Sequence, residues 1–111
     1  MNLYYNDDYV AAEHDFDTTR KSQAIAQSLM TRPIAGVRLV SPTSLTVAQL
    51  KQVHDPVYVD AVRTGRPLKL AESNGFLWDP GVWKMATATN GGAVAAALDA
   101  MKNGVAGSLS S

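Results

Sequence analysis

The residues best suited to metal chemistry in this chain are His14 and His54, because the sequence has two histidines and no cysteine. A catalytic zinc usually takes three protein ligands from His, Cys, Asp or Glu and leaves one position for water. His14 opens a polar cluster over residues 14–17 that matches no established ligand spacing and is better interpreted as a loop before a helix. His54 precedes Asp55, which is typical of a hydrogen-bonded structural histidine at a helix junction. The pattern therefore predicts no metal site, no cofactor and no catalytic residue in this chain.

Serine and glycine motifs indicate no other chemistry. Ser108, Ser110 and Ser111 have no obvious relation to a histidine, and a Gly-x-Ser-x-Gly nucleophile elbow is absent. Gly91 and Gly92 lie within a helical pattern and not between a strand and a helix start, where a phosphate-binding loop would be. We interpret the two glycines as structural, at a point where the helix kinks or crosses another element closely.

Composition indicates one unit spanning residues 1–111. The net charge is zero and no run of Lys or Arg is present, so neither nucleic acid nor an anionic membrane is an expected partner. The acidic residues before Arg20 suggest a solvated loop. The N-terminus does not resemble a signal peptide and no apolar run is long enough to span a bilayer, so we expect a cytoplasmic protein.

Strands and helices are expected to alternate in the first half of the chain. Residues 1–5 predict a first strand, residues 19–30 a helix and residues 37–40 a second strand. Thr46 and Gln49 have the spacing of a capping box, which predicts a short helix ending near Val53 or His54. Asp55-Pro56 predicts the start of the next helix, which should end at Gly65.

The second half is dominated by one long helix. Residues 66–78 have no clear period and predict a surface loop, and Asp79-Pro80 repeats the Asp-Pro helix start. A stripe at three- and four-residue steps predicts the packed face of the helix. Its members are Val82, Met85, Ala86, Thr89, Ala93, Ala97, Leu98 and Met101. Trp78 and Trp83 could line a cleft, although packing against the sheet is favoured. Asn103-Gly104 should end the helix before a third strand over residues 105–109.

This order predicts an α/β fold with a small, incomplete parallel sheet and flanking helices. The crossovers between strands are long enough for parallel pairing. Parallel sheets are normally covered on both faces, which three strands with these helices would achieve only in part.

The segment from Gln52 to Val59 resembles a helix junction of the histone deacetylase, acetoin-utilization and acetylpolyamine amidohydrolase superfamily. In that family a leucine-rich helix ends in a Val-His-x-x-x-Tyr signature, which matches Val53, His54 and Tyr58. The resemblance covers nearly the whole chain. Further matches follow the family's order: Tyr4-Tyr5, His14 to Asp17, Arg20, Pro80-Gly81-Val82-Trp83, Gly91-Gly92 and Asp99 to Gly104.

The resemblance implies the three-layer arginase/deacetylase fold and hydrolysis of an N-acetyl amide, such as acetyl-lysine or an acetylpolyamine, by zinc-activated water. The family's zinc ligands, paired histidines and transition-state tyrosine would lie beyond residue 111. The chain is thus expected to be an N-terminal segment that is inactive by itself, with zinc belonging to a full-length member. Where the family often has His-Pro-Glu, in the loop that shapes the pocket rim, this chain departs from the pattern with His14 followed by Asp15 and Phe16.

Some members contact the substrate through an aspartate in the loop before the long helix. Asp79 or Glu72 could occupy that place, although a helix N-cap is the favoured role for Asp79. Tyr58 is expected to point inward and to pack under the sheet.

Two hypotheses remain open. The chain is either the N-terminal segment of such an enzyme or a stand-alone α/β module that acts by self-association or protein binding. The expected partner is therefore the missing C-terminal part of the domain or a second copy of this chain, which would pack on the small residues around Ala86, Ala93 and Ala97.

Overall fold

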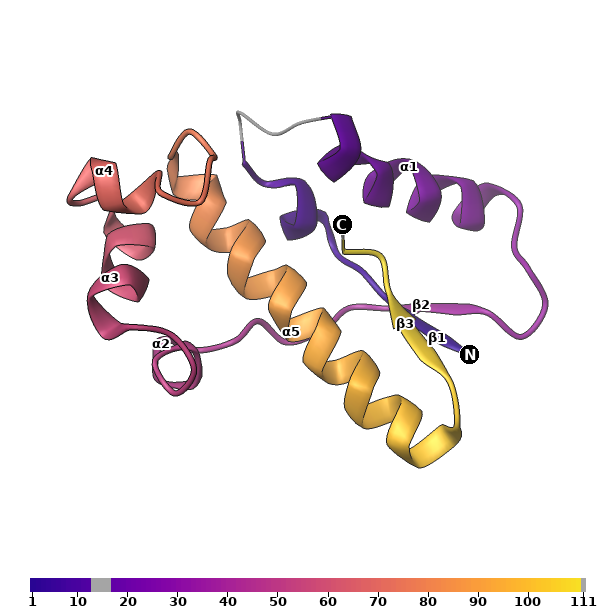
Figure 1. Cartoon of the computed structure of the whole chain (residues 1–111). Helices are drawn as coiled ribbons and strands as arrows, with labels where there is room; N and C mark the ends of the chain where they lie inside the picture. The colour runs from indigo at the N-terminus through magenta and orange to yellow at the C-terminus, as the bar shows by residue number, and fades with distance from the viewer. Residues whose placement is uncertain (13–16, 111) are drawn as a thin grey trace.

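The computed structural model describes residues 1–12 and 17–110, and for residues 17–19 the backbone only. Its elements, in chain order, are β1 (Asn2–Tyr4), the 3-10 helix η1 (Asp7–Val10), α1 (Asp17–Thr31), β2 (Arg38–Val40), α2 (Val47–Leu50), α3 (Pro56–Thr64), α4 (Leu68–Ala71), α5 (Pro80–Asn103) and β3 (Ala106–Ser108). The Cα atoms span 47 × 29 × 16 Å, so the molecule is thin in one direction. Figure 1 shows α5 as its longest element.

Three parallel strands form the sheet in the order β2-β1-β3. Leu3 of the central strand lies opposite Leu39 on one side and Gly107 on the other. The connection from β1 to β2 contains α1, and the connection from β2 to β3 contains the other α-helices. The predicted class, a small parallel sheet with flanking helices, is confirmed.

The Asp99 carboxylate fastens α5 to the central strand. It accepts hydrogen bonds from the amide of Asn2 at 2.8 Å and from the hydroxyl of Tyr4 at 2.9 Å. Asn103, one turn further along α5, donates a third bond at 2.7 Å. These donors, Asn103 first among them, hold the pKa of Asp99 below its ordinary value. The hydrogen bond to Asp99 in turn raises the pKa of Tyr4, because it favours the protonated phenol.

Tyr5 begins the core that joins α1 to the rest of the molecule. Side chains alternate along a strand, so Tyr5 points away from the face on which Tyr4 meets α5. It packs with Tyr9, with Ala26 of α1 and with Ala88 of α5. The Tyr5 and Tyr9 rings meet edge to face, with centroids 5.3 Å apart. Helices α1 and α5 thus each contribute a buried alanine to the same cluster.

Local capping chemistry explains where most helices begin and end. Thr46 and Gln49 form the predicted capping box, with the Gln49 backbone amide donating to the Thr46 hydroxyl at 3.2 Å. Asp55 caps α3, and Gly65 ends it in the left-handed conformation with φ of 77°. Asp79 caps α5 by accepting from the Gly81 amide at 2.7 Å. Each of these predicted boundaries is confirmed.

Two short elements were not predicted. The segment expected to be a loop over residues 66–78 contains α4, a single turn whose N-cap residue, Pro67, makes no side-chain cap bond. The acidic stretch after β1 contains η1, where the Asn6 side chain accepts from the Asp8 amide at 3.1 Å. Both are single turns, so neither leaves a periodic pattern in the sequence.

The packed face of α5 differs from the predicted stripe in its C-terminal half. Val82 is buried as expected, but Ala93, Ala97, Leu98 and Met101 are exposed. The buried face consists of Thr87, Ala88, Gly91, Gly92 and Ala96, together with Val82. The prediction was wrong because α5 is apolar on most sides, and periodicity alone could not select the face with the smallest residues.

The expectation of a close crossing at the two glycines is confirmed. A Cβ atom on Gly91 would lie 2.2 Å from the carbonyl oxygen of Thr43, and one on Gly92 would lie 1.6 Å from the Tyr9 hydroxyl. Neither position can accept a methyl group without movement of the surrounding atoms. Glycine at both positions lets α5 approach these segments closely.

Across the described ranges, none of the helices has the length and apolar character needed to cross a membrane.

Candidate functional site

A cavity of about 350 Å³ opens beside the carboxyl ends of the strands. Tyr9 reaches it from η1, which follows β1, and Ser110 reaches it from the residues after β3. The parallel strands β2 and β3 lie on opposite sides of β1, so the order in which strands are added to the sheet reverses at β1. In open α/β sheets, the crevice at such a reversal, outside the carboxyl ends of the strands, is where ligands bind. The volume is also within the usual range for small-molecule sites.

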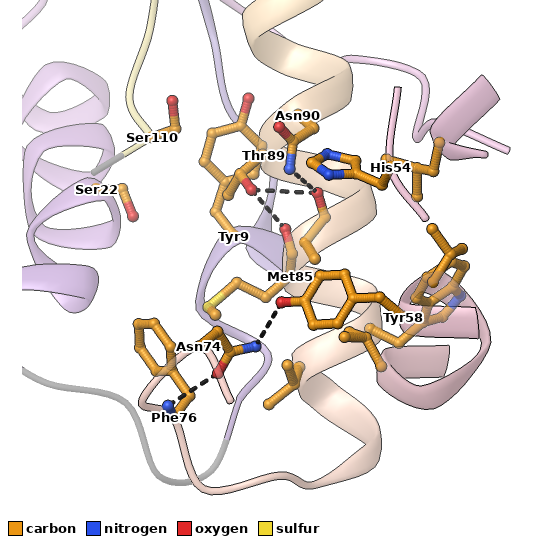
Figure 2. Close-up of a pocket in the computed structure, with 16 residues that line it drawn as sticks. Tyr9, Ser22, His54, Tyr58, Asn74, Phe76, Met85, Thr89, Asn90 and Ser110 are labelled. Carbon is orange, nitrogen blue, oxygen red and sulfur yellow. Dashed lines mark hydrogen bonds between the residues drawn. The ribbon is translucent and has the colours of Figure 1, made fainter. Parts of the chain in front are cut away.

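The elements around the cavity come from all parts of the chain. Helix α5 crosses its length, while α3 and the residues after α2 close one side (Figure 2). Ser22 contributes from α1. The apolar lining consists of Leu50, Val59, Val62, Phe76, Val82, Trp83, Met85 and Ala86. No Asp, Glu, Lys or Arg is among the described residues that line the cavity.

Tyr9 forms the part of the lining nearest the sheet. Its side chain is 2% exposed, and its hydroxyl is 2.9 Å from the Ser108 hydroxyl at the end of β3. Burial raises the pKa of Tyr9, and the bond to Ser108 opposes this shift. Tyr9 thus remains a neutral phenol at neutral pH and joins the η1 turn to the third strand.

His54 and Tyr58 come from the segment that carries the deacetylase-like signature, and both line the cavity. Their ring centroids are 6.5 Å apart, because Asp55 starts α3 between them and places Tyr58 on its first turn. His54 is exposed, which puts it at the opening of the cavity. Within the described ranges, its imidazole makes no hydrogen bond.

Tyr58 also fixes the loop that precedes α5. Its hydroxyl accepts a hydrogen bond from the Asn74 amide at 3.2 Å, and the Asn74 side-chain oxygen accepts from the Phe76 backbone at 2.9 Å (Figure 2). The half-buried Tyr58 ring packs against the cluster of Val62 and Val82. The prediction that Tyr58 packs under the sheet was therefore wrong, since its neighbours are on α3 and α5.

Two polar side chains of α5 enter the lining one after the other. Thr89 donates to the carbonyl of Met85 at 2.8 Å, which leaves its oxygen lone pairs available. The Asn90 amide donates one hydrogen bond to the carbonyl of Ala86 at 2.8 Å. The second N–H of Asn90 and its oxygen make no bond with the described part of the chain, so this carboxamide can offer both a donor and an acceptor to a ligand.

The two predicted substrate-contacting residues lie elsewhere. Asp79 is buried as the N-cap of α5, and Glu72 accepts a hydrogen bond from the Trp78 backbone at 2.9 Å. Neither lines the cavity. Both hold the α4–α5 connection in shape, which agrees with the favoured N-cap role of Asp79. The second tryptophan, Trp83, does line the cavity.

Sequence reasoning missed Tyr9, Thr89, Asn90 and Ser22 as site residues. Thr89 and Asn90 lie within the predicted long helix, but no local motif indicates that either of them lines a cavity. The available signal was the position of Tyr9 and Ser110 just after two parallel strands, which would have placed both at one edge of the sheet.

The zinc implied by the resemblance can be compared with the donors present. In the described residues, no group of three or more His, Cys, Asp or Glu side chains lies close enough to hold a metal ion. Among the described lining residues, His54 is the one with an imidazole; it has an aromatic neighbour, and no carboxylate is in that lining. His14 and Asp15 lie outside the described residues. The described donor set does not fit a zinc site.

No protein-family model matches this chain, and a search of curated proteins finds no match to it either.

Proposed function

We propose that this chain forms the N-terminal portion of a deacetylase-like zinc amidohydrolase, whose family reaction is hydrolysis of N-acetyl amides. The observation that carries the proposal is the position of the signature residues. His54 and Tyr58 line a cavity at the reversal of strand order in a parallel α/β sheet. Ligands of open α/β proteins bind at this place in the sheet. The segment was identified by resemblance alone, so its location at such a cavity is independent support.

In this proposal the chain shapes one side of a pocket and performs no chemistry by itself. Its two histidines are forty residues apart in sequence, and the described residues that line the cavity with His54 include no Cys, Asp or Glu. The zinc ligands and the paired histidines would come from sequence that follows Ser111. The coding sequence after the Ser111 codon should then specify a Gly-His-His motif followed by Asp-x-His. A reading frame without these motifs would refute the proposal.

The isolated chain should bind no stoichiometric zinc and should not hydrolyse an acetyl-lysine peptide. Elemental analysis after dialysis measures the first quantity, and a deacetylation assay with added zinc measures the second. The control is the chain extended by its downstream coding sequence, which should gain both properties. One zinc per isolated chain, with turnover above background, would contradict the assignment of the chemistry to the missing part.

A second candidate function is self-association, favoured by an apolar surface on α5. Val94, Leu98 and Met101, which we call the outer stripe, are 45%, 60% and 84% exposed. Beside them a shallow groove of about 290 Å³ runs between α5 and the residues after β2. A second copy packed on this surface would bury the stripe, and a symmetric dimer is the commonest closed arrangement.

Sedimentation at micromolar concentration distinguishes this candidate from a monomer. Leu98→Lys should dissociate the dimer. Leu77→Lys is the matched control, because both leucines are 60% exposed and Leu77 lies outside the outer stripe. A wild-type chain that sediments as a monomer, or equal behaviour of the two variants, would reject the outer stripe as the contact.

A further inference from the structure

The cavity described above has the properties of a binding site for one kind of small molecule in this chain as it stands. Its lining has no Asp, Glu, Lys or Arg among the described residues. A charged ligand would lose its hydration there without gaining a carboxylate, ammonium or guanidinium partner from the described lining, which is costly. The lining therefore favours an uncharged ligand.

The apolar lining favours a flat, aromatic ligand. Phe76, Trp83 and Tyr58 present rings to the cavity, and Met85 presents a polarisable thioether. Aromatic rings and methionine sulfur both make favourable contacts with aromatic ligands beyond simple burial of area. The volume of about 350 Å³ exceeds that of a single six-membered ring, so a fused bicyclic ring system is the better match.

The polar groups specify what such a ring should carry. Asn90 offers one N–H and one carbonyl oxygen, and the His54 imidazole at the opening can donate or accept. A neighbouring N–H and C=O on one edge of the ligand, as in a lactam, would pair with the carboxamide of Asn90. Figure 2 shows Asn90 and His54 at one end of the cavity and Phe76 at the other, so a ring between them could reach both kinds of lining.

We propose that the cavity binds an uncharged, fused aromatic molecule that carries a lactam-type donor and acceptor on one edge. The inference rests on the lining of the cavity and does not depend on the deacetylase-like assignment. Asn90 pairs with the polar edge, the aromatic residues and Met85 hold the rings, and His54 closes the opening.

Binding of 2-quinolinone to the isolated chain tests this, followed by Trp fluorescence and by NMR shifts of the Met85 methyl group. We expect saturable binding with a Kd of about 1 mM or tighter, as for a fragment of this size. Quinoline lacks the lactam and should bind about 3- to 10-fold more weakly, the effect of one or two hydrogen bonds. Quinoline-2-carboxylate carries a charge on the same rings and should bind at least tenfold more weakly.

A matched pair of variants tests whether the ligand binds in the cavity. Ala86→Leu fills the cavity and should weaken 2-quinolinone binding at least tenfold, whereas Ala97→Leu, exposed on the same helix outside the cavity, should leave it unchanged. Asn90→Leu should abolish the preference for 2-quinolinone over quinoline. Equal binding in Ala86→Leu and Ala97→Leu, or stronger binding of the carboxylate, would overturn the proposal. If Ala86→Leu fails to fold, the wild-type chain still tests the proposal. NMR shift changes on addition of 2-quinolinone that are confined to residues outside the cavity would overturn it.

Discussion

Replacement of Gly92 by alanine is the most direct test of how α5 meets the rest of the molecule. The new methyl carbon would lie 1.6 Å from the Tyr9 hydroxyl oxygen, 2.8 Å from Cζ of the same ring and 2.9 Å from Oγ of Ser108. Tyr9 is 2% exposed and cannot swing into solvent without breaking its contacts. The helix or the ring must therefore shift.

The expected cost follows from three contributions. Alanine improves helix propensity over glycine by about 1 kcal/mol. Overpacking of a filled core costs about 1–3 kcal/mol, and loss of the Tyr9–Ser108 hydrogen bond with a buried hydroxyl left unpaired costs about another 1–3 kcal/mol. The net destabilisation is about 3 kcal/mol, a large part of the total of roughly 5–15 kcal/mol expected for a domain of this size.

Urea denaturation followed by far-UV circular dichroism measures this difference. Ala93→Gly, the exposed neighbour on the same helix, is the control and should cost about 1 kcal/mol by propensity alone. In a Tyr9→Phe background, which removes the atom at 1.6 Å, the cost of Gly92→Ala should fall by at least about 1 kcal/mol. A Gly92→Ala variant as stable as the wild type would refute the close packing of α5 on Tyr9.

Three further predictions concern the ionisable and aromatic groups. The pKa of Asp99 is lowered in the folded chain, so the ionised carboxylate stabilises the fold at pH values above its ordinary pKa of 3.8. This stabilisation is lost as the pH falls through the folded pKa. In Asp99→Asn, the free energy of unfolding should therefore change less between pH 5 and pH 2 than in the wild type. Burial, followed by the hydrogen bond to Asp7, raises the pKa of Tyr5 from 10.0 to about 12, so the stability that this group contributes is full below pH 10 and is lost as the pH rises through 12. A phenolate absorbance titration in which all four tyrosines ionise near pH 10 would contradict this. Tyr58→Ala should lower the free energy of unfolding, measured by urea denaturation, by about 2 kcal/mol, because the ring is only half-buried. Tyr58→Phe, which removes only the hydroxyl bonded to Asn74, should lower it by less than about 1 kcal/mol. A loss below about 0.5 kcal/mol in the alanine variant would show that the ring packs against nothing.

The parts of the fold that the sequence predicted are those determined by local chemistry. The Asp55 and Asp79 caps, the Thr46 capping box and the Gly65 terminus each depend on residues within a few positions of one another. The connections between the strands are too long for tight hairpins and long enough for the crossovers that parallel pairing needs, which predicted the parallel sheet. These features do not require knowledge of the tertiary contacts.

The buried face of α5 and the cavity depend on tertiary contacts and could not be predicted in the same way. Val94 and Leu98 are larger and more apolar than Gly91 and Gly92, yet they are the exposed ones. The smaller residues are buried because Tyr9 and the Thr43 backbone fill the space beside them. The cavity likewise combines side chains from both ends of the chain, which no sequence window contains.

The central position of β1 has a consequence for synthesis on the ribosome. Of the three strands, β1 is synthesised before the other two and can pair with β2 early. Its other edge pairs only with β3, which follows β1 by roughly one hundred residues. At about 5–20 residues per second, that edge stays without its strand partner for roughly 5–21 s. During this interval Asn2 and Tyr4 also lack Asp99, their partner near the end of α5. The edge of β1 that faces β3 therefore gains its partners only after α5 and β3 have been synthesised.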